Sequence, residues 1–428
     1  MKILIRNGEL IDPANKINRE RLDLLVIDGK IADINENISV KDADIINADG
    51  LIVVPGLIDM HVHLREPGQE YKETIKTGTK SALKGGFTSI MTMANTNPVI
   101  DSVQVLKDLL ARINDQAVVN IFPASSITIR MQGEMLVDVD DLVVNGVVAL
   151  SDDGKPVMNS QIMKNALIAC KRHNIPIISH CEWIDKEYDG WVMNKGEMSK
   201  KLGIIGIPNS AEEKMVERDI NLAEETDSHI HIAHVSTAGT VELIRQAKKR
   251  GVKVTAEATP HHFTLTDETV EKYGANAKMN PPLRSKDDVS AVIEGLKDHT
   301  IDVIATDHAP HAEYEKAKGL KDAPFGIVGL ETCLSLVITE LVNKGHLSLY
   351  EAIEKMTINP AKILNLKKGT LSVGADADIT IIDINKEWTV DPSKFESKGR
   401  NTPFIDWKLK GSPAMIVGGN GKIYRISN

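Results

Sequence analysis

Short apolar runs alternate with longer amphipathic stretches through the middle of the chain. Eight runs have strand length and are rich in β-branched and other apolar residues: 57–60, 88–93, 118–123, 147–150, 175–179, 229–233, 252–256 and 301–306. Apolar residues recur at helical spacing in the intervening stretches 73–84, 161–172, 211–225 and 241–249. Eight strands with helical crossovers predict an α/β fold, a (β/α)8 TIM-like barrel over residues 56–365. An open doubly wound sheet is the main alternative, but no Gly-rich dinucleotide loop follows the first strand.

The two ends of the chain carry a different pattern, in which short β runs are separated by turn residues. At the N-terminal end these runs are 2–5, 22–27 and 51–54, and near the C-terminal end they are 379–382 and 414–417. No single run is long enough to bury a sheet alone. We therefore expect residues 1–55 and 366–428 to form together one small β-sandwich beside the barrel.

The composition is that of an ordinary soluble globular protein, with 428 residues, 42% hydrophobic and 26% charged. A net charge of −9 argues against nucleic acid or an anionic membrane as a partner. The three cysteines, Cys170, Cys181 and Cys333, are too few and too far apart for a disulfide framework, which favours a reducing compartment. We find no signal-peptide core and no run of about 18 apolar residues, so we expect a cytoplasmic protein.

The first candidate for chemistry is Asp59-Met60-His61-Val62-His63, which closes the first predicted barrel strand. Residues two apart in a strand point to the same side, so both imidazoles can reach one ion. By itself the pattern is weak evidence, because histidines at such positions are often only hydrogen-bonded or solvated.

Further candidate ligands follow other predicted strands, each at the same end. They are the pair Asp152-Asp153 after 147–150, His180 after 175–179, His234 after 229–233 and Asp307 after 301–306. In a closed barrel the carboxyl ends of the strands form one rim. Imidazoles and carboxylates suit zinc, and an incomplete set of protein ligands leaves room for a catalytic water. The sequence therefore predicts a zinc site.

Other histidines and a cysteine receive structural interpretations. His229 and His231 share a strand face, and we expect one of them to be packed or on the outer side. His261-His262 follows the seventh strand, where support of the site is favoured over direct ligation. Cys181 points away from the side of His180 if the strand continues, which favours a packed thiol. Surface positions are expected for the remaining candidates, His173, His299 and His346.

With these residues assembled, the whole chain resembles the amidohydrolase superfamily and, within it, the class I dihydroorotases of bacterial type. The most specific stretches, in chain order, are 59–68, 94–98, 151–154, 279–284, 306–311 and 324–326. Hydantoinases and many relatives carry a carboxylated lysine at the end of the fourth strand. Here Ser-Asp-Asp-Gly stands in that place, which favours the dihydroorotase branch, and Lys155 is already beyond the strand end.

The resemblance implies a role for each matching position. Zinc is held by the positions that match His61, His63, His180 and His234, and Asp153 matches a carboxylate that ligates the metal and bridges two ions where two are bound. Asp307 matches the catalytic aspartate and is counted with the metal site. Substrate contacts are implied for Arg65, Asn95 and His311 at the substrate carboxylate, for Asn280 near the pyrimidine edge, and for the loop Pro324-Phe325-Gly326.

The implied activity is a zinc-dependent cyclic amidohydrolase that interconverts dihydroorotate and N-carbamoyl-L-aspartate in de novo pyrimidine (UMP) biosynthesis. Asp307 would take a proton from the attacking water and return it to the leaving ring nitrogen. Arg65 offers a planar, charged fork for the substrate carboxylate.

Several alternatives stay open. A hydantoinase or allantoinase would act on another cyclic amide, and a non-catalytic homologue would keep the barrel as a scaffold. The ligand set fits one zinc ion or two. The sequence also leaves open a homo-oligomer, association with aspartate transcarbamoylase, and any role of Lys155, His261 or His262.

Overall fold

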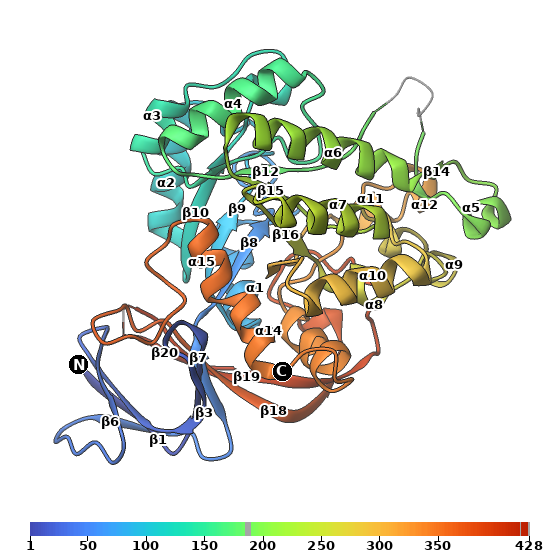
Figure 1. Cartoon of the computed structure of the whole chain (residues 1–428). Coiled ribbons are helices and arrows are strands. Elements are labelled where there is room, and N and C mark those ends of the chain that lie inside the picture. The colour runs from blue at the N-terminus through green and yellow to red at the C-terminus, as the bar shows by residue number, and fades with distance from the viewer. Residues whose placement is uncertain (185–189, 420, 427–428) are drawn as a thin grey trace.

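The computed structural model of the chain describes residues 1–184, 190–419 and 421–426 (Figure 1). Its centre is an eight-stranded parallel sheet in the order β17-β16-β15-β12-β11-β10-β9-β8. The strands are β8 (Leu57–Val62), β9 (Phe87–Thr92), β10 (Asn120–Ser125), β11 (Ala149–Leu150), β12 (Ile177–Ser179), β15 (Ile230–Ile232), β16 (Val254–Ala258) and β17 (Val303–Ile304). All eight predicted strands are therefore found, with ends that differ by a few residues.

The two edges of this sheet approach each other and nearly close a barrel. Val62 at the end of β8 forms a parallel bridge with His308, which follows β17. The amide of His63 donates to the carbonyl oxygen of His308 at 2.9 Å. Lower in the barrel, the Asp59 carboxylate accepts from the amide of Thr306 at 3.2 Å. The predicted barrel is confirmed, and the open doubly wound sheet is excluded.

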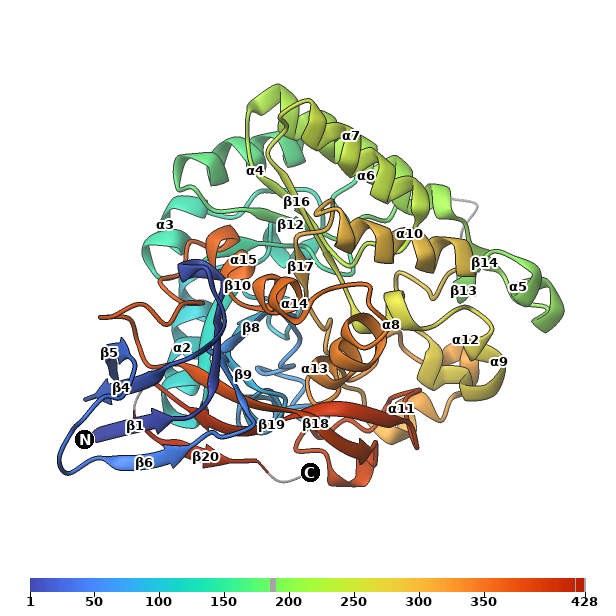
Figure 2. The same ribbon diagram turned by 60° about the horizontal axis from the view of Figure 1, so that its bottom comes forward.

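Helices cover the outside of the barrel (Figures 1 and 2). The principal crossover helices are α1 (Ile75–Lys84), α2 (Val103–Gln116), α3 (Val139–Val144), α4 (Ser160–Arg172), α6 (Asn209–Thr226), α7 (Ala238–Lys249), α10 (Lys286–Lys297) and α14 (Leu349–Met356). Their buried faces share one apolar core with the strands, and the interior of the barrel is filled by a second cluster that includes Met60, Met91, Ile178 and Val303. The barrel is thus a packed core and leaves only its rim for chemistry.

Shorter elements connect the strands and helices of the barrel and of the accessory sheets. They are α5 (Glu197–Leu202), α8 (Pro260–Thr264), α9 (Thr269–Tyr273), α11 (Glu313–Lys316), α12 (Gly319–Asp322), α13 (Cys333–Leu336), a π-helical turn (Val337–Val342), α15 (Ile358–Ile363), 3-10 turns at Pro13–Asn15, Ile129–Met131, Gly274–Ala277 and Pro392–Lys394, and the strand pair β13 (Met193–Asn194) and β14 (Gly206–Ile207). No helix within the described ranges is long and apolar enough to cross a membrane.

Two smaller sheets lie beside the barrel; the four-stranded one contains N-terminal strands alone, and the six-stranded one combines strands from both ends of the chain. One has the order β5-β4-β1-β6 and the other β20-β19-β18-β7-β2-β3. Their bounds are β1 (Lys2–Arg6), β2 (Glu9–Asp12), β3 (Ile17–Arg21), β4 (Asp23–Ile27), β5 (Lys30–Asn35), β6 (Asp44–Asn47), β7 (Ile52–Pro55), β18 (Ile379–Thr389), β19 (Lys408–Val417) and β20 (Ile423–Arg425). One apolar cluster, with Ile5, Val26, Val53 and Ile381 among its members, joins the sheets. The predicted sandwich is confirmed.

The β18–β19 pair extends beyond the sandwich and runs along the barrel towards the side of α11 (Figure 2). Val390, Phe395 and Phe404 from the connection between these strands pack with Leu265 and Ile327 of the barrel's rim segments. The division of the chain into two domains, residues 1–55 with 366–428 and residues 56–365, stays a prediction. The packing shows that part of the C-terminal segment lies against the barrel.

Candidate metal centre and active site

Five of the predicted metal-site residues meet in one buried cluster at the carboxyl ends of the strands. His61 and His63 lie at the end of β8, and Asp153, His180 and His234 lie just beyond β11, β12 and β15. Each of these side chains is at most 6% exposed. Residues at or just beyond the carboxyl ends of four strands thus meet at one point on the rim.

The cluster contains two groups of side chains able to hold a metal ion, and Asp153 belongs to both. His61 and His63 form the first group with it: their Nε2 atoms lie 3.3 Å from Asp153 Oδ1 and 3.4 Å from Asp153 Oδ2, respectively. His180 Nδ1 and His234 Nε2 form the second, at 3.5 and 3.6 Å from Asp153 Oδ1. A carboxylate shared by two groups of imidazoles is suited to bridging two ions.

Three polar atoms of the cluster are buried without a hydrogen-bond partner among the described residues: His61 Nε2, Asp153 Oδ1 and His234 Nδ1. A buried polar atom without a partner is costly unless something else satisfies it. His61 Nε2 and Asp153 Oδ1 belong to the first metal-competent group, so the donor set and these two atoms fit a metal ion.

Hydrogen bonds on the far side of each ring orient the first two imidazoles. His61 Nδ1 lies 2.5 Å from Glu257 Oε1, and His63 Nδ1 lies 2.9 Å from Asn95 Oδ1. Both partners are oxygen acceptors, so each Nδ1 carries the proton and each Nε2 is free to face the cluster. Asn95 was predicted as a substrate-binding residue, and the structure places its side chain between His63 and Asp153, since its Nδ2 donates to Asp153 at 3.4 Å.

Glu257 is a functional residue that the sequence analysis missed. It lies one residue before the end of β16, is fully buried, and also accepts from the amide of His234 at 3.2 Å. Its other oxygen, Oε2, lies 3.2 Å from His231 Nε2. The same signal that singled out the other ligands, a polar residue at the end of an apolar strand, would have found it, since it follows the predicted strand 252–256.

The histidine pair His229 and His231 continues this hydrogen-bonded column into the barrel. His231 Nδ1 and His229 Nε2 lie 2.9 and 2.8 Å from the hydroxyl of Thr255. Both histidines are packed side chains, and burial lowers the pKa of His229 to about 4. They support Glu257 rather than forming part of the cluster.

Asp307 lies over the first group of ligands. Its Oδ1 is 3.0 Å from His63 Nε2 and 3.6 Å from His61 Nε2. Burial opposes its ionisation, but the neighbouring imidazoles outweigh burial and hold the pKa of the Asp307 carboxyl below its ordinary value. The carboxylate is therefore ionised and able to accept a proton at the cluster.

Three site residues leave their strands in the left-handed backbone region. The φ angles are +62° at Arg65, +34° at His234 and +48° at Asp307. Non-glycine residues adopt this region uncommonly, and such positions concentrate at functional sites. The backbone conformation at these three positions is therefore unfavourable by itself, and it directs the side chains of Arg65, His234 and Asp307 into the site.

The predicted carboxylate-binding residues Arg65 and His311 lie side by side on the rim. Arg65 Nη2 is 3.4 Å from His311 Nε2, and Arg65 Nε donates to the Pro310 carbonyl oxygen at 3.3 Å. His311 Nε2 is also 2.7 Å from the carbonyl oxygen of Phe325. Burial, followed by the charges of Arg65 and Lys72, lowers the pKa of His311 well below its ordinary value, so the ring is neutral.

The remaining predicted substrate residues are Asn280 and the loop Pro324-Phe325-Gly326. Asn280 Nδ2 donates to Glu182 Oε2 at 3.0 Å and lies 3.5 Å from His180 Nε2. In the loop Pro324-Phe325-Gly326, the Phe325 ring lies 4.6 Å from Lys278 Nζ. The Gly326 amide also donates to the carbonyl oxygen of Lys278 at 2.9 Å, so the loop is joined to the segment that leads to Asn280. The contacts of Asn280 and of the loop with substrate stay predictions.

Several other interpretations can now be compared with the structure. His262 bonds Thr259 and the Pro281 carbonyl oxygen at 2.8 and 3.0 Å, in keeping with structural support. His261 is buried, and its Nε2 has no hydrogen-bond partner among the described residues. Lys155 is exposed and belongs to neither metal-competent group. The Cys181 thiol is packed beside Ser179 and Asp219, as expected.

Comparison with known proteins agrees with this geometry. The family model for Dihydro-orotase-like proteins matches residues 50–240, and that for the Amidohydrolase family matches residues 202–419. A curated dihydroorotase of Pelotomaculum thermopropionicum is 56% identical, over 98% of both chains. Another of Acetivibrio thermocellus is 52% identical, again over 98% of both. The chain belongs to the dihydroorotase family of amidohydrolases.

Solved structures share the fold at lower sequence identity. A dihydropyrimidinase from Brevibacillus agri superposes with a TM-score of 0.88 at 24% identity, covering 100% of this chain and 95% of the other. An L-hydantoinase from Arthrobacter aurescens gives 0.87 at 26% identity, with 99% and 97% covered. These likenesses support the barrel with its accessory sheets, while the dihydroorotase family is assigned by the curated relatives.

Proposed function

We propose that this protein is a zinc-dependent dihydroorotase that interconverts dihydroorotate and N-carbamoyl-L-aspartate reversibly, as a step of de novo pyrimidine (UMP) biosynthesis. The observation that carries the proposal is the placement of Asp307 against an Asp153-centred histidine cluster, with Arg65 on the same rim. Relatives that are about half identical along the full chain bear the name dihydroorotase.

Zinc is the metal that this donor set favours, since imidazole nitrogens and a carboxylate with no thiolate or extensive oxygen cage suit it. His61, His63, His180, His234 and Asp153 would hold it, and Asp307 lies within reach of the first group. When bound, zinc supplies a polarising positive charge for an amide carbonyl and lowers the pKa of water. The shared Asp153 favours two ions over one.

Asp307 is proposed as the general base and then the general acid. Its ionised carboxylate accepts the proton of the water that attacks the ring carbonyl, and it returns that proton to the departing ring nitrogen. Cyclisation of N-carbamoyl-L-aspartate follows the same path in reverse. Cyclisation consumes a protonated carboxyl group, so low pH favours ring closure and high pH favours hydrolysis.

Arg65 is proposed to bind the substrate carboxylate, with His311 and Asn95 beside it. The guanidinium is buried and offers a planar set of donors that matches a carboxylate. Neutral His311 adds a donor or acceptor without adding charge. This local cation allows an acidic protein to hold an anionic substrate. Asn280 and the loop Pro324-Phe325-Gly326 are proposed to contact the pyrimidine ring.

The alternatives lose support at particular residues. A hydantoinase or allantoinase of the carboxylated-lysine type needs a lysine where Asp153 stands, whereas Lys155 is exposed. A non-catalytic scaffold would be free to lose its ligands and base, whereas the cluster and Asp307 are complete here.

The deciding experiment is a spectrophotometric assay of dihydroorotate hydrolysis, run beside a hydantoin and allantoin, with zinc quantified in the same preparation. We expect turnover of dihydroorotate and zinc in stoichiometric amount. Turnover of only the other two substrates would reject the proposal.

The metal assignment has its own test in His61→Ala. Loss of one imidazole from the first group should lower the zinc content measured by elemental analysis. The surface variant His299→Ala, which changes an exposed histidine, serves as the control. An unchanged zinc content in His61→Ala would remove His61 from the ligand set.

Assembly and location complete the proposal. We propose a cytoplasmic homo-oligomer that associates with aspartate transcarbamoylase, whose reaction forms carbamoyl-aspartate. Light scattering during size-exclusion chromatography, with and without that enzyme, tests both statements. A monomer that elutes unchanged in the mixture would reject them.

A further inference from the structure

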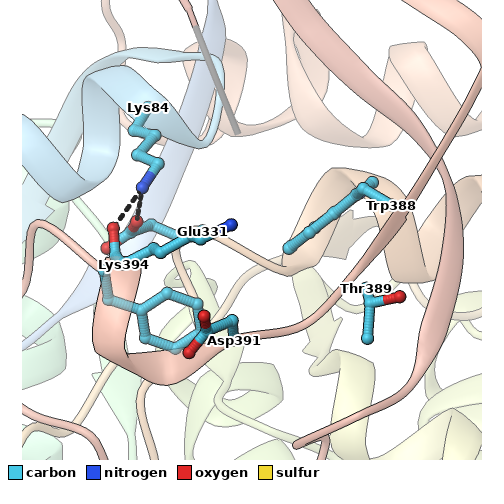
Figure 3. A pocket seen from close by; sticks show the side chains of 7 residues that line it. Lys84, Glu331, Trp388, Thr389, Asp391 and Lys394 are labelled. Atoms are coloured by element: carbon cyan, nitrogen blue, oxygen red, sulfur yellow. Dashed lines mark hydrogen bonds and ion pairs between the residues drawn. The ribbon is translucent and has the colours of Figure 1, made fainter.

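Hydrogen bonds and an ion pair hold the connection between β18 and β19 against the barrel. Lys84, at the end of α1, lies 3.1 Å from Glu331 Oε2 and donates to the carbonyl oxygen of Lys394 (Figure 3). Glu331 Oε1 accepts from the amides of Glu396 and Ser397 at 2.8 and 3.1 Å. We term the segment 394–401 the strap. Lys84 and the buried carboxylate of Glu331 hold the start of the strap beside the pocket shown in Figure 3.

The strap then runs beneath the residue that follows Asp307. The Ser397 hydroxyl donates to Glu73 Oε2, and the same oxygen lies 3.4 Å from His308 Nε2. His308 and Glu73 are both fully buried. Through Glu73, the strap is therefore connected to His308, the residue that follows Asp307.

Asn401 ends the strap and joins two rim segments. Its Nδ2 donates to the carbonyl oxygens of Ala309 and Gly326, both at 3.0 Å. Its Oδ1 accepts from the amide of His311 at 3.1 Å, and its backbone carbonyl accepts from Val328 at 2.9 Å. Asn401 is 4% exposed, so these bonds are shielded from water.

Two of the partners of Asn401, His311 and Gly326, belong to the proposed substrate-binding residues. His311 lies beside Arg65, and Gly326 belongs to the loop 324–326. Lys316 holds that loop from a second direction, because its Nζ donates to the carbonyl oxygens of Pro324 and Gly326 at 2.9 Å each. The loop is thus fixed through its backbone, and its position depends on the strap.

We propose that Asn401 is a positioning residue for the substrate-carboxylate end of the active site. It fixes His311 and the loop 324–326 relative to each other from outside the site. This proposal rests on the proposed function for the identity of the substrate. It gives the C-terminal segment, which the sequence assigns to the small sandwich, a part in substrate binding.

An asparagine is required here because the position needs a donor on one side and an acceptor on the other. The isosteric Asn401→Asp keeps the acceptor for the His311 amide but turns an anionic oxygen towards two carbonyl oxygens. Asn401→Ala removes all three side-chain bonds. Asn120→Ala is the matched control, because Asn120 Nδ2 also joins two segments, through the Thr88 carbonyl oxygen and the Asp378 carboxylate, at 3.0 and 3.1 Å.

The experiment measures KM and kcat for dihydroorotate, zinc content, melting temperature and amide hydrogen exchange of peptides covering 309–328, in the full-length enzyme. Loss of one or two net hydrogen bonds at this joint should raise KM about tenfold or more for both Asn401 variants. We expect kcat to change little and zinc content to stay unchanged, since the metal cluster is untouched. Exchange in 309–328 should accelerate.

Asn120→Ala should lower the melting temperature without raising KM or accelerating exchange in 309–328. A wild-type KM in both Asn401 variants, or a KM rise of the same size in Asn120→Ala, would overturn the proposal. If the wild-type enzyme leaves dihydroorotate unchanged, the proposed function fails. Hydrogen exchange in 309–328 then still decides whether Asn401 fixes the two rim segments.

Discussion

In the proposed mechanism the Asp307 carboxylate serves two steps of the reaction. Its Oδ1 lies against the imidazoles of His63 and His61, and its charge attracts the buried guanidinium of Arg65. The neighbouring imidazoles hold the pKa of this carboxyl below its ordinary value, so the proposed base is ionised and can accept the proton of the attacking water. The proposal also requires the same carboxylate to reach the ring nitrogen that leaves.

Asp307→Asn should remove proton transfer while keeping the shape of the site. General acid–base catalysis contributes roughly 100-fold to 10,000-fold, so kcat should fall by about 100-fold or more. Zinc content and binding of a non-hydrolysed substrate analogue, measured by calorimetry, should be close to wild type. Residual turnover above a tenth of the wild-type rate would exclude Asp307 from the acid–base role.

Glu257 affects the proposed metal site indirectly, through its hydrogen bond with His61. It accepts from His61 Nδ1 and is itself held by His231, so it fixes both the tautomer and the direction of the ring that faces Asp153. Carboxylates that orient a metal-binding histidine in this way commonly change metal affinity by about 10-fold to 100-fold when altered.

Glu257→Gln should therefore weaken zinc binding by about 10-fold or more in a competition with a chromophoric chelator. Glu212→Gln is the control, because Glu212 is also a buried carboxylate, but it accepts from the amides of Ser236 and Thr237 and from no side chain of the cluster. Equal zinc affinity in the two variants would show that the Glu257–His61 bond does not govern the metal site.

At the scale of elements, strand ends explain most of what the sequence could predict. Apolar runs located all eight barrel strands, and a polar residue directly after such a run identified His180 and His234. The more polar strands β3 and β6 carried too few apolar residues to be recognised. Asn401 could not be predicted at all, because its partners are brought to it by packing of the strap and no local pattern encodes that contact.

The turn between α1 and β9 shows a close approach that also has no sequence signature. Gly85 has φ −77°, which any residue can adopt, yet a Cβ there would lie 2.1 Å from the carbonyl oxygen of Leu330. The restriction comes from the neighbouring segment, which leads into α13, and not from the turn itself.

Gly85→Ala should consequently destabilise the protein by about 1–3 kcal/mol, as expected for overpacking against backbone. Without the clash, the loss of chain entropy in the unfolded state would make the same change stabilising by about 0.4–1 kcal/mol. Urea unfolding gives the sign. Gly196→Ala is the control, since a Cβ at Gly196 would meet no atom nearer than 3.4 Å and its φ is −169°. Stabilisation by Gly85→Ala would contradict the close approach.

At the scale of the whole molecule, the long β18–β19 pair links the sandwich to the barrel. The carbonyl oxygen of Asp378 accepts from the Gly56 amide at 2.7 Å, where the chain enters the barrel. Farther along, the Trp388 indole donates to the Ser335 hydroxyl of α13 at 3.0 Å. Contacts of this kind along the full length of the pair favour opening of barrel and sandwich together.

The three cysteines lie in different parts of the barrel domain, so the chemical reactivity of their thiols can show which part unfolds. Cys170 lies in α4, Cys181 follows β12 and Cys333 begins α13, and each is at most 3% exposed. Burial raises the pKa of the Cys170 thiol to about 12 and raises the pKa values of Cys181 and Cys333 well above that of a free thiol. Because the thiolate is the reactive form, both access and ionisation protect these groups in the folded state.

An aromatic disulfide reagent should therefore label none of the three thiols in native protein, and raising the pH from about 7 to about 9, which ionises a free cysteine, should change this little. Three thiols per chain should react after unfolding in guanidinium chloride. If the linked sheets open as one unit, intermediate denaturant should yield chains with either no label or three, as counted by intact mass spectrometry after a short pulse. A population labelled only at Cys333 would show instead that the β18–β19 pair detaches from α13 before the barrel opens.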